Sequence, residues 1–440
     1  MKKIVRCRKI SMVILMFFVI AAFTGCAGRQ QESESVQIPS NYDGLIKYFE
    51  AQKTADSITC WYTNEEDQNW LDAAANDFEK EFGVKVKLVY YDGVSLMDDL
   101  NQASQTGDGP EVYLLGNDQL ELAANSGMAE ENTYINDALW KDKYPEVAKN
   151  AVTYQGKQYG YPVYFDTYCL VYDAKLLQTA PASIDDILDF LDAYEDTGST
   201  KAVFRWDVAD PYINTMFLAS YANLFGENGD DATAFQINSE QSVAAMEYFQ
   251  SLSAYLWMNK DNISHDTIMR RIQDGTLVLG LCKSDILPTL YEMQSGKISG
   301  NADNEGEENP EETDYKISYV PSLTKEMTSA PFSTTYNAFV NPYGADTSLG
   351  NLFSMFLSCG YADRQFAGNG KLPVIDQKDS FDELQRIIYA QYLNSKPVPK
   401  VMVLGDYLTE GGIAFDAIWS GEDAKEQLDA LQTKMEEKIK

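Results

Sequence analysis

The feature that most constrains the fold is a regular alternation of two hydrophobic periods between residues 57 and 126. Short apolar or alternating runs predict strands, and apolar residues three or four apart predict helices. Gly83 and Gly127 follow two of the expected helices and supply a common stop signal. Strands that alternate with helices build a parallel sheet covered on both faces, so this region predicts an α/β fold. The expected strands are 57–62, 84–91 and 111–115, and the expected helices are 68–82, 95–105 and 118–126.

The same pattern continues in the rest of the chain. Ser183 and Asp186 form a capping-box-like start for one helix, and Ser420 to Asp423 precede a last helix. A chain of 440 residues, at roughly 150 residues per domain, has room for two to three units of this kind. Further expected elements are helices at 240–256 and 266–274 and a strongly apolar strand at 276–282.

The N-terminus has the composition of an export signal. Basic residues precede an apolar run from Ile10 to Phe23, which is shorter than the about 20 residues of a membrane span. The segment that ends in Cys26 resembles the lipobox of bacterial lipoproteins, in which cleavage leaves a lipidated Cys26 at the new N-terminus. We therefore expect a lipoprotein signal peptide at 1–25, and the lipidated cysteine with a flexible tether at 26–55. This would hold the chain on the extracytoplasmic face of the cell membrane by its lipid anchor only; an ordinary signal peptide or an uncleaved anchor is the alternative.

The charge balance excludes one class of partner. The chain has 35 basic and 67 acidic residues, a formal net charge of −32. Such a chain has no basic excess to displace counterions from phosphates, so we expect no nucleic-acid partner. The excess of acid also disfavours strongly anionic ligands unless a local cluster of basic groups overrides it.

Neither a metal nor a cofactor is expected. His265 is the single histidine, which excludes a multi-histidine zinc site. The acidic segment Ser299–Asp314 matches some offsets of a calcium loop, but Pro310 interrupts the pattern and a solvated loop is the better interpretation. The cysteines inside the expected domains sit in separate apolar stretches without a CxxC pair, so we expect buried free thiols rather than a disulfide framework. They are Cys60, Cys169, Cys282 and Cys359.

Several segments together resemble the extracellular solute-binding proteins of ABC importers, in the carbohydrate group that includes maltodextrin-binding proteins. The most specific is 154–162 (YQGKQYGYP), similar to the family's GKxYGxP segment, and 109–115 resembles its GxxPDV strand. The resemblance implies a periplasmic-binding-protein-like α/β fold, with two lobes of mixed or parallel sheets joined by a multi-strand hinge. The expected crossings lie near 165–167, 329–334 and 370; the expected lobes are 56–165 with 334–370 and 166–333 with 371–440.

The resemblance also implies a function. We expect a monomer that captures a neutral oligosaccharide between the two lobes and delivers it to ABC permease subunits, with no chemistry performed on the sugar. One alternative keeps the fold and binds a peptide, a polyamine or a chelate, and another is a surface lectin without a permease. A secreted carbohydrate-active enzyme needs only paired carboxylates, but the sequence contains no nucleophile elbow, P-loop, HExxH motif or dinucleotide turn.

Candidate ligand contacts follow from the chemistry of a sugar and from positions that match the family. Aromatic rings suit the apolar faces of a sugar, and carboxylates and amides suit its hydroxyls. Tyr212 is the strongest candidate because Asp210-Pro211-Tyr212 resembles the family's acidic-Pro-Tyr turn. Glu65 and Glu66 could instead be a solvated helix start, and Asp118 a helix cap. The full set is Asn64, Glu65, Glu66, Asn117, Asp118, Tyr164, Asp166, Trp206, Asp210, Tyr212, Lys283, Ser284 and Tyr407.

Overall fold

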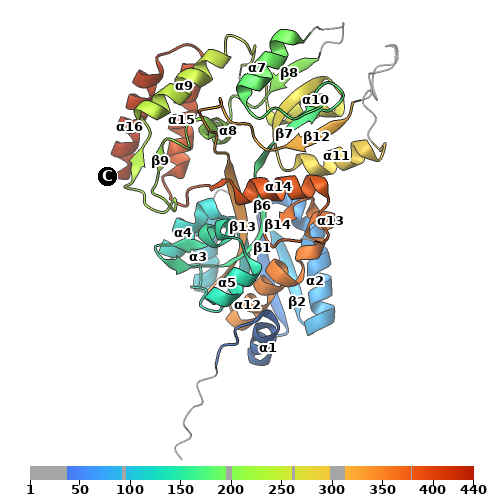
Figure 1. Ribbon diagram of the computed structural model, residues 1–440. Coiled ribbons are helices and arrows are strands. Elements are labelled where there is room, and N and C mark those ends of the chain that lie inside the picture. Colours follow the sequence, from blue (N-terminus) through green and yellow to red (C-terminus); the bar gives the residue numbers. More distant parts are fainter. Residues whose placement is uncertain (1–36, 92–95, 195–200, 260–262, 298–312, 378) are drawn as a thin grey trace, which may run out of the picture. The chain divides into compact units, whose positions relative to one another are not determined.

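The computed structural model describes residues 37–91, 96–194, 201–259, 263–297, 313–377 and 379–440 (Figure 1). Two larger β-sheets, each with helices packed against it, account for most of residues 38–440. The helices are α1 (Tyr42–Gln52), α2 (Gln68–Phe82), α3 (Leu96–Thr106), α4 (Leu120–Asn125), α5 (Asp137–Lys143), α6 (Glu146–Ala151), α7 (Ile184–Ala193), α8 (Pro211–Asn214), α9 (Glu240–Leu252), α10 (His265–Gln273), α11 (Ile286–Gln294), α12 (Thr347–Met355), α13 (Gln365–Asn369), α14 (Glu383–Leu393), α15 (Leu404–Trp419) and α16 (Ala424–Ile439).

The first sheet has the strand order β14-β6-β13-β3-β1-β2, and β15 also pairs with β13. Strands β2, β1 and β3 are parallel, as the strand–helix alternation predicts. Strand β13 comes from much later in the chain and lies antiparallel between β3 and β6. The sheet is therefore mixed. Its strands are β1 (Ser57–Tyr62), β2 (Lys85–Tyr90), β3 (Val112–Gly116), β6 (Tyr161–Asp166), β13 (Phe332–Val340), β14 (Leu372–Pro373) and β15 (Lys396–Pro397).

The second sheet has the order β12-β7-β11-β8. Strand β7 follows β6 after a single residue, Thr167, so one extended segment carries the chain from the first sheet to the second. Strand β11 is antiparallel to β7 and parallel to β8. Its strands are β7 (Tyr168–Asp173), β8 (Ala202–Arg205), β11 (Leu277–Lys283) and β12 (Tyr315–Ser318); two small hairpins pair β4 (Thr153–Tyr154) with β5 (Lys157–Gln158) and β9 (Asn223–Leu224) with β10 (Phe235–Gln236).

Local signals placed most element boundaries correctly. Helix α2 has the predicted bounds, and Gly83 ends it in the left-handed conformation with φ of 68°. Ser183 and Asp186 form the expected capping box of α7. Asp423 caps α16, whose buried residues include Leu428 and Leu431. Helix α9 is shorter than predicted, since it ends at Leu252 rather than near residue 256.

Two segments differ from the expected domain division. Residues 42–52 were expected in the flexible tether, but they form α1 because Leu45 and Phe49 lie one turn apart and are both buried. Helix α1 packs against α12, so an ordered part of the fold begins before residue 56. Strands β14 and β15 come from the range assigned to the second lobe, yet they pair with β6 and β13 of the first sheet.

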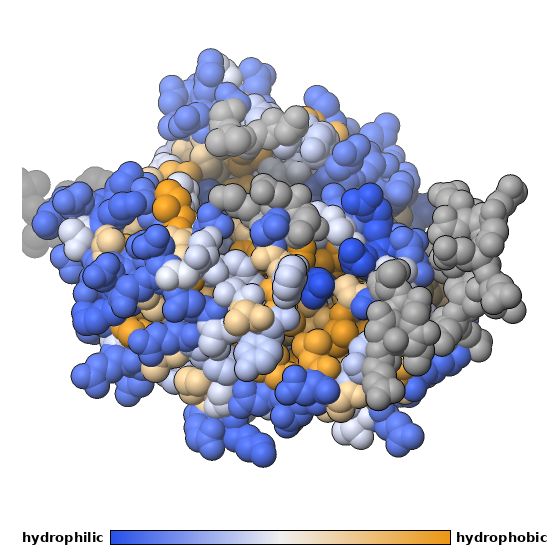
Figure 2. Space-filling view, turned by 90° about the horizontal axis from the view of Figure 1, so that it is seen from above, coloured by the Kyte–Doolittle hydropathy of each residue, from blue (hydrophilic) through white to orange (hydrophobic). Residues whose placement is uncertain are grey.

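The four cysteines among the described residues are free thiols, as the spacing predicts. Cys60, Cys169 and Cys282 are buried and Cys359 is half-buried. Residues 299–312 of the acidic segment lie outside the described residues, as does the expected signal peptide with Cys26. Among the described helices, none is both long and apolar enough to cross a membrane. The face shown in Figure 2 is covered mainly by hydrophilic side chains, with smaller apolar patches between them.

Candidate ligand-binding site

A cavity of about 250 Å³ lies where the chain passes from the first sheet to the second. Asp118 follows β3, and residues 166–168 connect β6 to β7. Lys283 ends β11, so the second sheet also contributes to the wall. Thr334 lies opposite Asp166 in the β13–β6 register. The remaining lining residues are Tyr212, Phe332 and Tyr336.

Asp166 is held by groups from two directions. The Ser284 hydroxyl donates to its Oδ1 at 3.1 Å, and the Lys371 ammonium lies 3.2 Å from both carboxylate oxygens. Glu66 lies 3.6 Å from the same ammonium. Burial alone would lower the pKa of Lys371, but the carboxylates of Asp166, Asp285 and Glu66 outweigh it and raise that pKa. These contacts therefore fix the direction of the Asp166 carboxylate, as a precise hydroxyl acceptor needs.

Asp118 is the second carboxylate of the cavity. Burial raises its pKa, and a hydrogen bond from Gln119 Nε2 at 3.0 Å opposes that shift. The close approach of its side chain to Gly116 explains the glycine, because a Cβ there would meet Asp118 Oδ1 at 2.3 Å. A carboxylate with few partners of its own has free lone pairs for the hydroxyls of a ligand.

Tyr212 is held by the turn that the sequence singled out. The Asp210 carboxylate caps α8 by accepting from the Tyr212 backbone N–H at 2.9 Å, and it also accepts from the Tyr168 hydroxyl at 3.2 Å. Pro211 occupies the first helical position, where its missing N–H costs nothing. The Tyr212 ring packs edge-to-face on Phe332, with centroids 6.3 Å apart. The ring is thus half-buried and rigidly mounted at the edge of the cavity.

A second cavity of about 210 Å³ adjoins the first. Asp118 and Tyr212 line both of them, so the two chambers meet at this pair. Gln119 also lines the second chamber. Its other walls are aliphatic or glycine: Leu122, Val401, Met402, Leu404, Gly405 and Leu408.

The arrangement is suited to holding a neutral polar molecule. Two carboxylates and one lysine can accept from and donate to hydroxyls, while Tyr212 offers an aromatic surface. In the part of the chain that the structure describes, no group of three or more His, Cys, Asp or Glu side chains is placed to hold a metal ion. His265 instead pairs with Asp285, with Nε2 3.1 Å from Oδ2.

The structure brings four of the predicted contacts together and places others elsewhere. The first chamber is lined by Asp118, Asp166, Tyr212 and Lys283. Asp210 and Ser284 do not line it but form hydrogen bonds with the lining residues Tyr168 and Asp166. Glu65 and Glu66 are exposed and line neither chamber. Asn64 donates from Nδ2 to the Tyr164 hydroxyl at 2.8 Å.

Four other predicted contacts have no exposed surface and are corrected to core positions. Trp206 packs among Phe204, Phe217 and Trp419 and donates to Asn214, and Tyr407 bonds Thr215. Both rings were expected to contact the sugar, but core side chains pack against the rings and hydrogen-bond their polar atoms. Tyr164 donates to Asp67 at 2.6 Å, and Asn117 joins the Val398 carbonyl to the Thr335 backbone N–H. The four residues Trp206, Tyr407, Tyr164 and Asn117 are each 0% exposed.

Sequence reasoning missed the residues that β13 contributes. Thr334 and Tyr336 lie two residues apart and therefore on one face of the strand. This two-residue spacing could have indicated both residues as ligand contacts, because residue 334 already lay in an expected crossing between the lobes. Leu122, Met402 and Leu408 gave no signal, because an aliphatic side chain in a helix or loop is usually packing.

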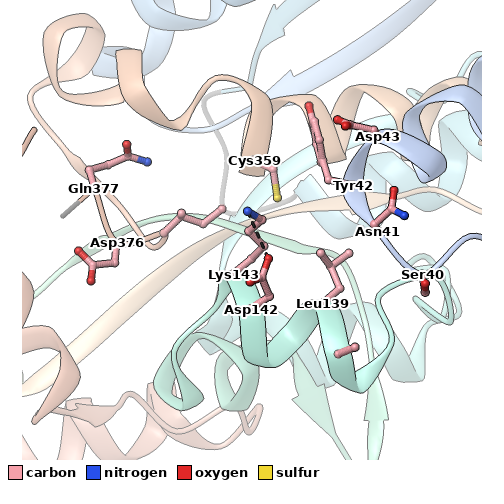
Figure 3. Close-up of a pocket in the computed structure, with 12 residues that line it drawn as sticks. Ser40, Asn41, Tyr42, Asp43, Leu139, Asp142, Lys143, Cys359, Asp376 and Gln377 are labelled. Atoms are coloured by element: carbon pink, nitrogen blue, oxygen red, sulfur yellow. Dashed lines mark ion pairs between the residues drawn. The ribbon is translucent and has the colours of Figure 1, made fainter. Parts of the chain in front are cut away.

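A larger cavity of about 670 Å³ lies apart from this site (Figure 3). It opens between the start of α1, helix α5 and residues 359 and 375–377. The Cys359 thiol and the Lys143 ammonium point toward each other there, and Lys143 pairs with Asp142 at 3.3 Å. Burial raises the pKa of the Cys359 thiol to about 11, so it stays protonated at neutral pH. None of the predicted contacts lines this cavity.

The fold and the two-sided cavity define a solute-binding protein, and the comparisons with known proteins agree. Residues 73–340, more than half of the chain, match the model of the family described as bacterial extracellular solute-binding protein, and the chain belongs to that family.

The chain is also similar to curated proteins over most of their length and its own. The chain is 23% identical over 371 residues to the maltodextrin-binding protein MdxE of Bacillus subtilis, covering 80% of this chain and 82% of the relative. It is 23% identical over 397 residues to a maltooligosaccharide ABC transporter solute-binding lipoprotein of Streptococcus pneumoniae, covering 86% and 88%.

Solved structures confirm the predicted fold class. A cyclo/maltodextrin-binding protein complexed with maltotetraose superposes with a TM-score of 0.74 at 18% identity, covering 89% of this chain and 99% of that one. An extracellular solute-binding protein of Staphylococcus aureus in complex with maltose gives a TM-score of 0.72 at 18% identity, covering 88% and 98%. The chain therefore has the periplasmic-binding-protein fold.

Proposed function

We propose that the chain captures a neutral oligosaccharide in the cavity between its two sheets and delivers it to the permease of an ABC transporter. The observation that carries the proposal is the meeting of Asp118, Asp166, Tyr212 and Lys283 at one cavity, which each sheet helps to form. These are the residue types that a sugar needs for its hydroxyls and for its apolar face. The names of the curated relatives, which bind maltodextrin or maltooligosaccharides, support the same ligand class.

Capture would use a hinge motion of two lobes. The wall is built by both sheets, and only a few strand segments such as 166–168 connect them. A ligand that contacts both sides favours the closed arrangement by its difference in affinity for the two states. The lobe boundaries at 165/166 and 333/334 remain part of this proposal, whereas the boundary at 370/371 is not kept, because β14 and β15 pair with strands of the first sheet.

The location and the partners are proposed on the same basis. Cys26 would carry the lipid anchor on the extracytoplasmic face, in agreement with the lipoprotein name of the streptococcal relative. The protein would act as a monomer that meets its permease subunits at the membrane, with no cofactor and no reaction at the sugar. A binding role of this kind needs no catalytic group, because the ligand leaves unchanged.

The first test is a thermal-shift screen of the mature chain, with Cys26→Ser to prevent lipidation. Neutral mono-, di- and oligosaccharides form the panel, and each well is checked afterwards for sugar breakdown. A ligand at 100 times its dissociation constant stabilises the fold by about 2.7 kcal/mol, which a thermal shift detects easily. A shift with intact sugar is expected. Breakdown products would identify an enzyme, and the absence of any shift would refute the sugar assignment and direct the search to peptides, polyamines and chelates.

A substitution then tests the site itself. Tyr212→Ala should weaken sugar binding by about 1–3 kcal/mol, since it removes the stacking and burial that the ring provides. Tyr343→Ala is the matched control, because that tyrosine is 58% exposed and lines neither chamber. An unchanged dissociation constant in a folded Tyr212→Ala protein would remove Tyr212 from the site.

A further inference from the structure

The two chambers that meet at Asp118 and Tyr212 have walls of different chemistry. Beyond this pair, the first chamber presents Asp166, Thr167 and Lys283, all of which can bond hydroxyls. The second chamber presents no charged side chain beyond Asp118. The side chains that line these adjoining cavities therefore change from mixed polar and aromatic to mainly aliphatic at the Asp118–Tyr212 pair.

The second chamber is aliphatic on most of its surface. Leu122 comes from α4 and Leu408 from α15, while Val401 and Met402 precede that helix. Met402 is 57% exposed. The polar side chains among its lining residues lie at the junction, where Gln119 donates to Asp118. An occupant of this chamber thus meets more apolar than polar surface.

A sugar ring is a poor occupant for such walls. Its hydroxyls would lose water and find side-chain acceptors or donors only at the junction, and an unpaired buried hydroxyl is costly. An apolar group placed there removes aliphatic surface from water, on both the ligand and the protein, without any such loss. The same walls therefore discriminate between a further sugar unit and an apolar substituent.

The size of the chamber indicates which substituents fit. Its volume is about 210 Å³. A dry cavity of about 150 Å³ lined by Leu, Ile and Phe already holds benzene. A benzene-sized ring or a short alkyl group therefore fits.

We propose that this site selects a glycoside whose sugar occupies the polar chamber and whose apolar substituent, an aryl or short alkyl group, occupies the aliphatic chamber. The proposal rests on the proposed function and narrows its ligand class. Tyr212 and Asp118, which line both chambers, then contact the ligand at the glycosidic junction.

Matched pairs of ligands test the proposal by calorimetric titration of the mature Cys26→Ser chain. Maltose, cellobiose and lactose are each compared with their phenyl and 4-nitrophenyl glycosides. For the sugar that binds, the aryl glycoside is expected to bind at least about tenfold more tightly, because the ring buries aliphatic surface that the free sugar leaves exposed.

Gly405 offers a way to fill the chamber. It lies in the first turn of α15, and a Cβ built on it meets no atom within 4 Å, so a larger side chain extends into open space. In Gly405→Leu the ratio of the two dissociation constants is expected to fall to about one. Thr409→Leu is the control, because it adds the same side chain to an exposed position one turn further along α15, outside the chamber, and should keep the ratio.

The possible outcomes distinguish failure of the glycoside selectivity from failure of sugar binding itself. Sugar binding without a preference for the aryl glycoside would overturn the inference and leave the proposed function standing. A preference that persists in Gly405→Leu would also overturn it, since the ring would then lie elsewhere. If a folded protein binds neither the sugars nor their glycosides, the proposed function fails and this inference fails with it.

Discussion

Lys400 provides the sharpest test of the energetics of this fold. It lies between β15 and α15, and its residue is 0% exposed. Its ammonium donates to the backbone carbonyl of Asn150 at 2.8 Å and to the side-chain oxygen of Asn150 at 2.9 Å. Both acceptors are neutral, and no ion pair of Lys400 occurs among the described residues. A buried cation without a counter-charge should weaken the fold at neutral pH.

The pKa of Lys400 determines the size and the sign of its effect on the free energy of unfolding. Burial lowers the pKa of Lys400 from 10.5 to about 8, and the more distant Asp230 carboxylate opposes part of that shift. Between these two pH values the unfolded chain binds more protons than the folded one, so stability rises with pH. A shift of this size corresponds to about 3 kcal/mol as an upper limit. The penalty is fully present below pH 8 and disappears as pH rises through 10.5.

The perturbation is Lys400→Met, which keeps the length of the side chain and removes its charge. We expect the wild type to gain about 2–3 kcal/mol relative to this variant as pH rises from 7 to 10.5. Urea denaturation at several pH values in this range measures the difference, and the comparison cancels the titration of other groups. Lys85→Met is the control because Lys85 is exposed, and its profile should run parallel to that of the wild type. Parallel curves for wild type and Lys400→Met would refute the reasoning.

Two further substitutions test the polar contacts that hold the sheets. Lys371→Met should lower the free energy of unfolding by about 2–4 kcal/mol, because it leaves the largely buried Asp166 carboxylate without its counter-charge; a loss below about 0.5 kcal/mol in urea denaturation would contradict this. Glu111→Ala should cost about 2–3 kcal/mol, because the Glu111 carboxylate accepts from the Thr59 and Ala345 backbone N–H groups at 2.7 and 3.2 Å and both would lose their partner. A thermal midpoint equal to that of the wild type would show that other acceptors replace Glu111.

The predictable part of the fold is the part that local patterns decide. The bounds of β1 and α2 came out as expected, because an apolar run, an amphipathic stripe and a terminal Gly83 all lie within one short segment. The capping box at Ser183 is equally local. The acidic-Pro-Tyr turn at 210–212 was found through a resemblance, and the structure shows why it works as a turn, since Asp210 caps the helix.

The unpredictable part depends on contacts between distant segments. Helix α1 was assigned to the tether that the polar segment 27–40 begins, although Leu45 and Phe49 recur at a helical spacing, and its packing on α12 makes both residues core. Trp206 and Tyr407 were expected at the ligand, although a large aromatic ring suits a core and a sugar plate equally well. Which role it takes depends on its neighbours, and Trp419 beside Trp206 and Thr215 beside Tyr407 come from distant segments. The same limit hid Met402 and Leu408, whose role depends on Tyr212 standing beside them.

The central position of β13 affects the order in which the protein can acquire its structure. Strands β3 and β6 leave the ribosome long before residues 332–340 are made, and each keeps an open edge until β13 arrives between them. Pairing over such a separation in sequence is slow, because a long loop must close first. The nascent N-terminal part therefore cannot complete its own sheet. For the exported lipoprotein proposed above, this order of synthesis would leave the first sheet incomplete until residues 332–340 are made.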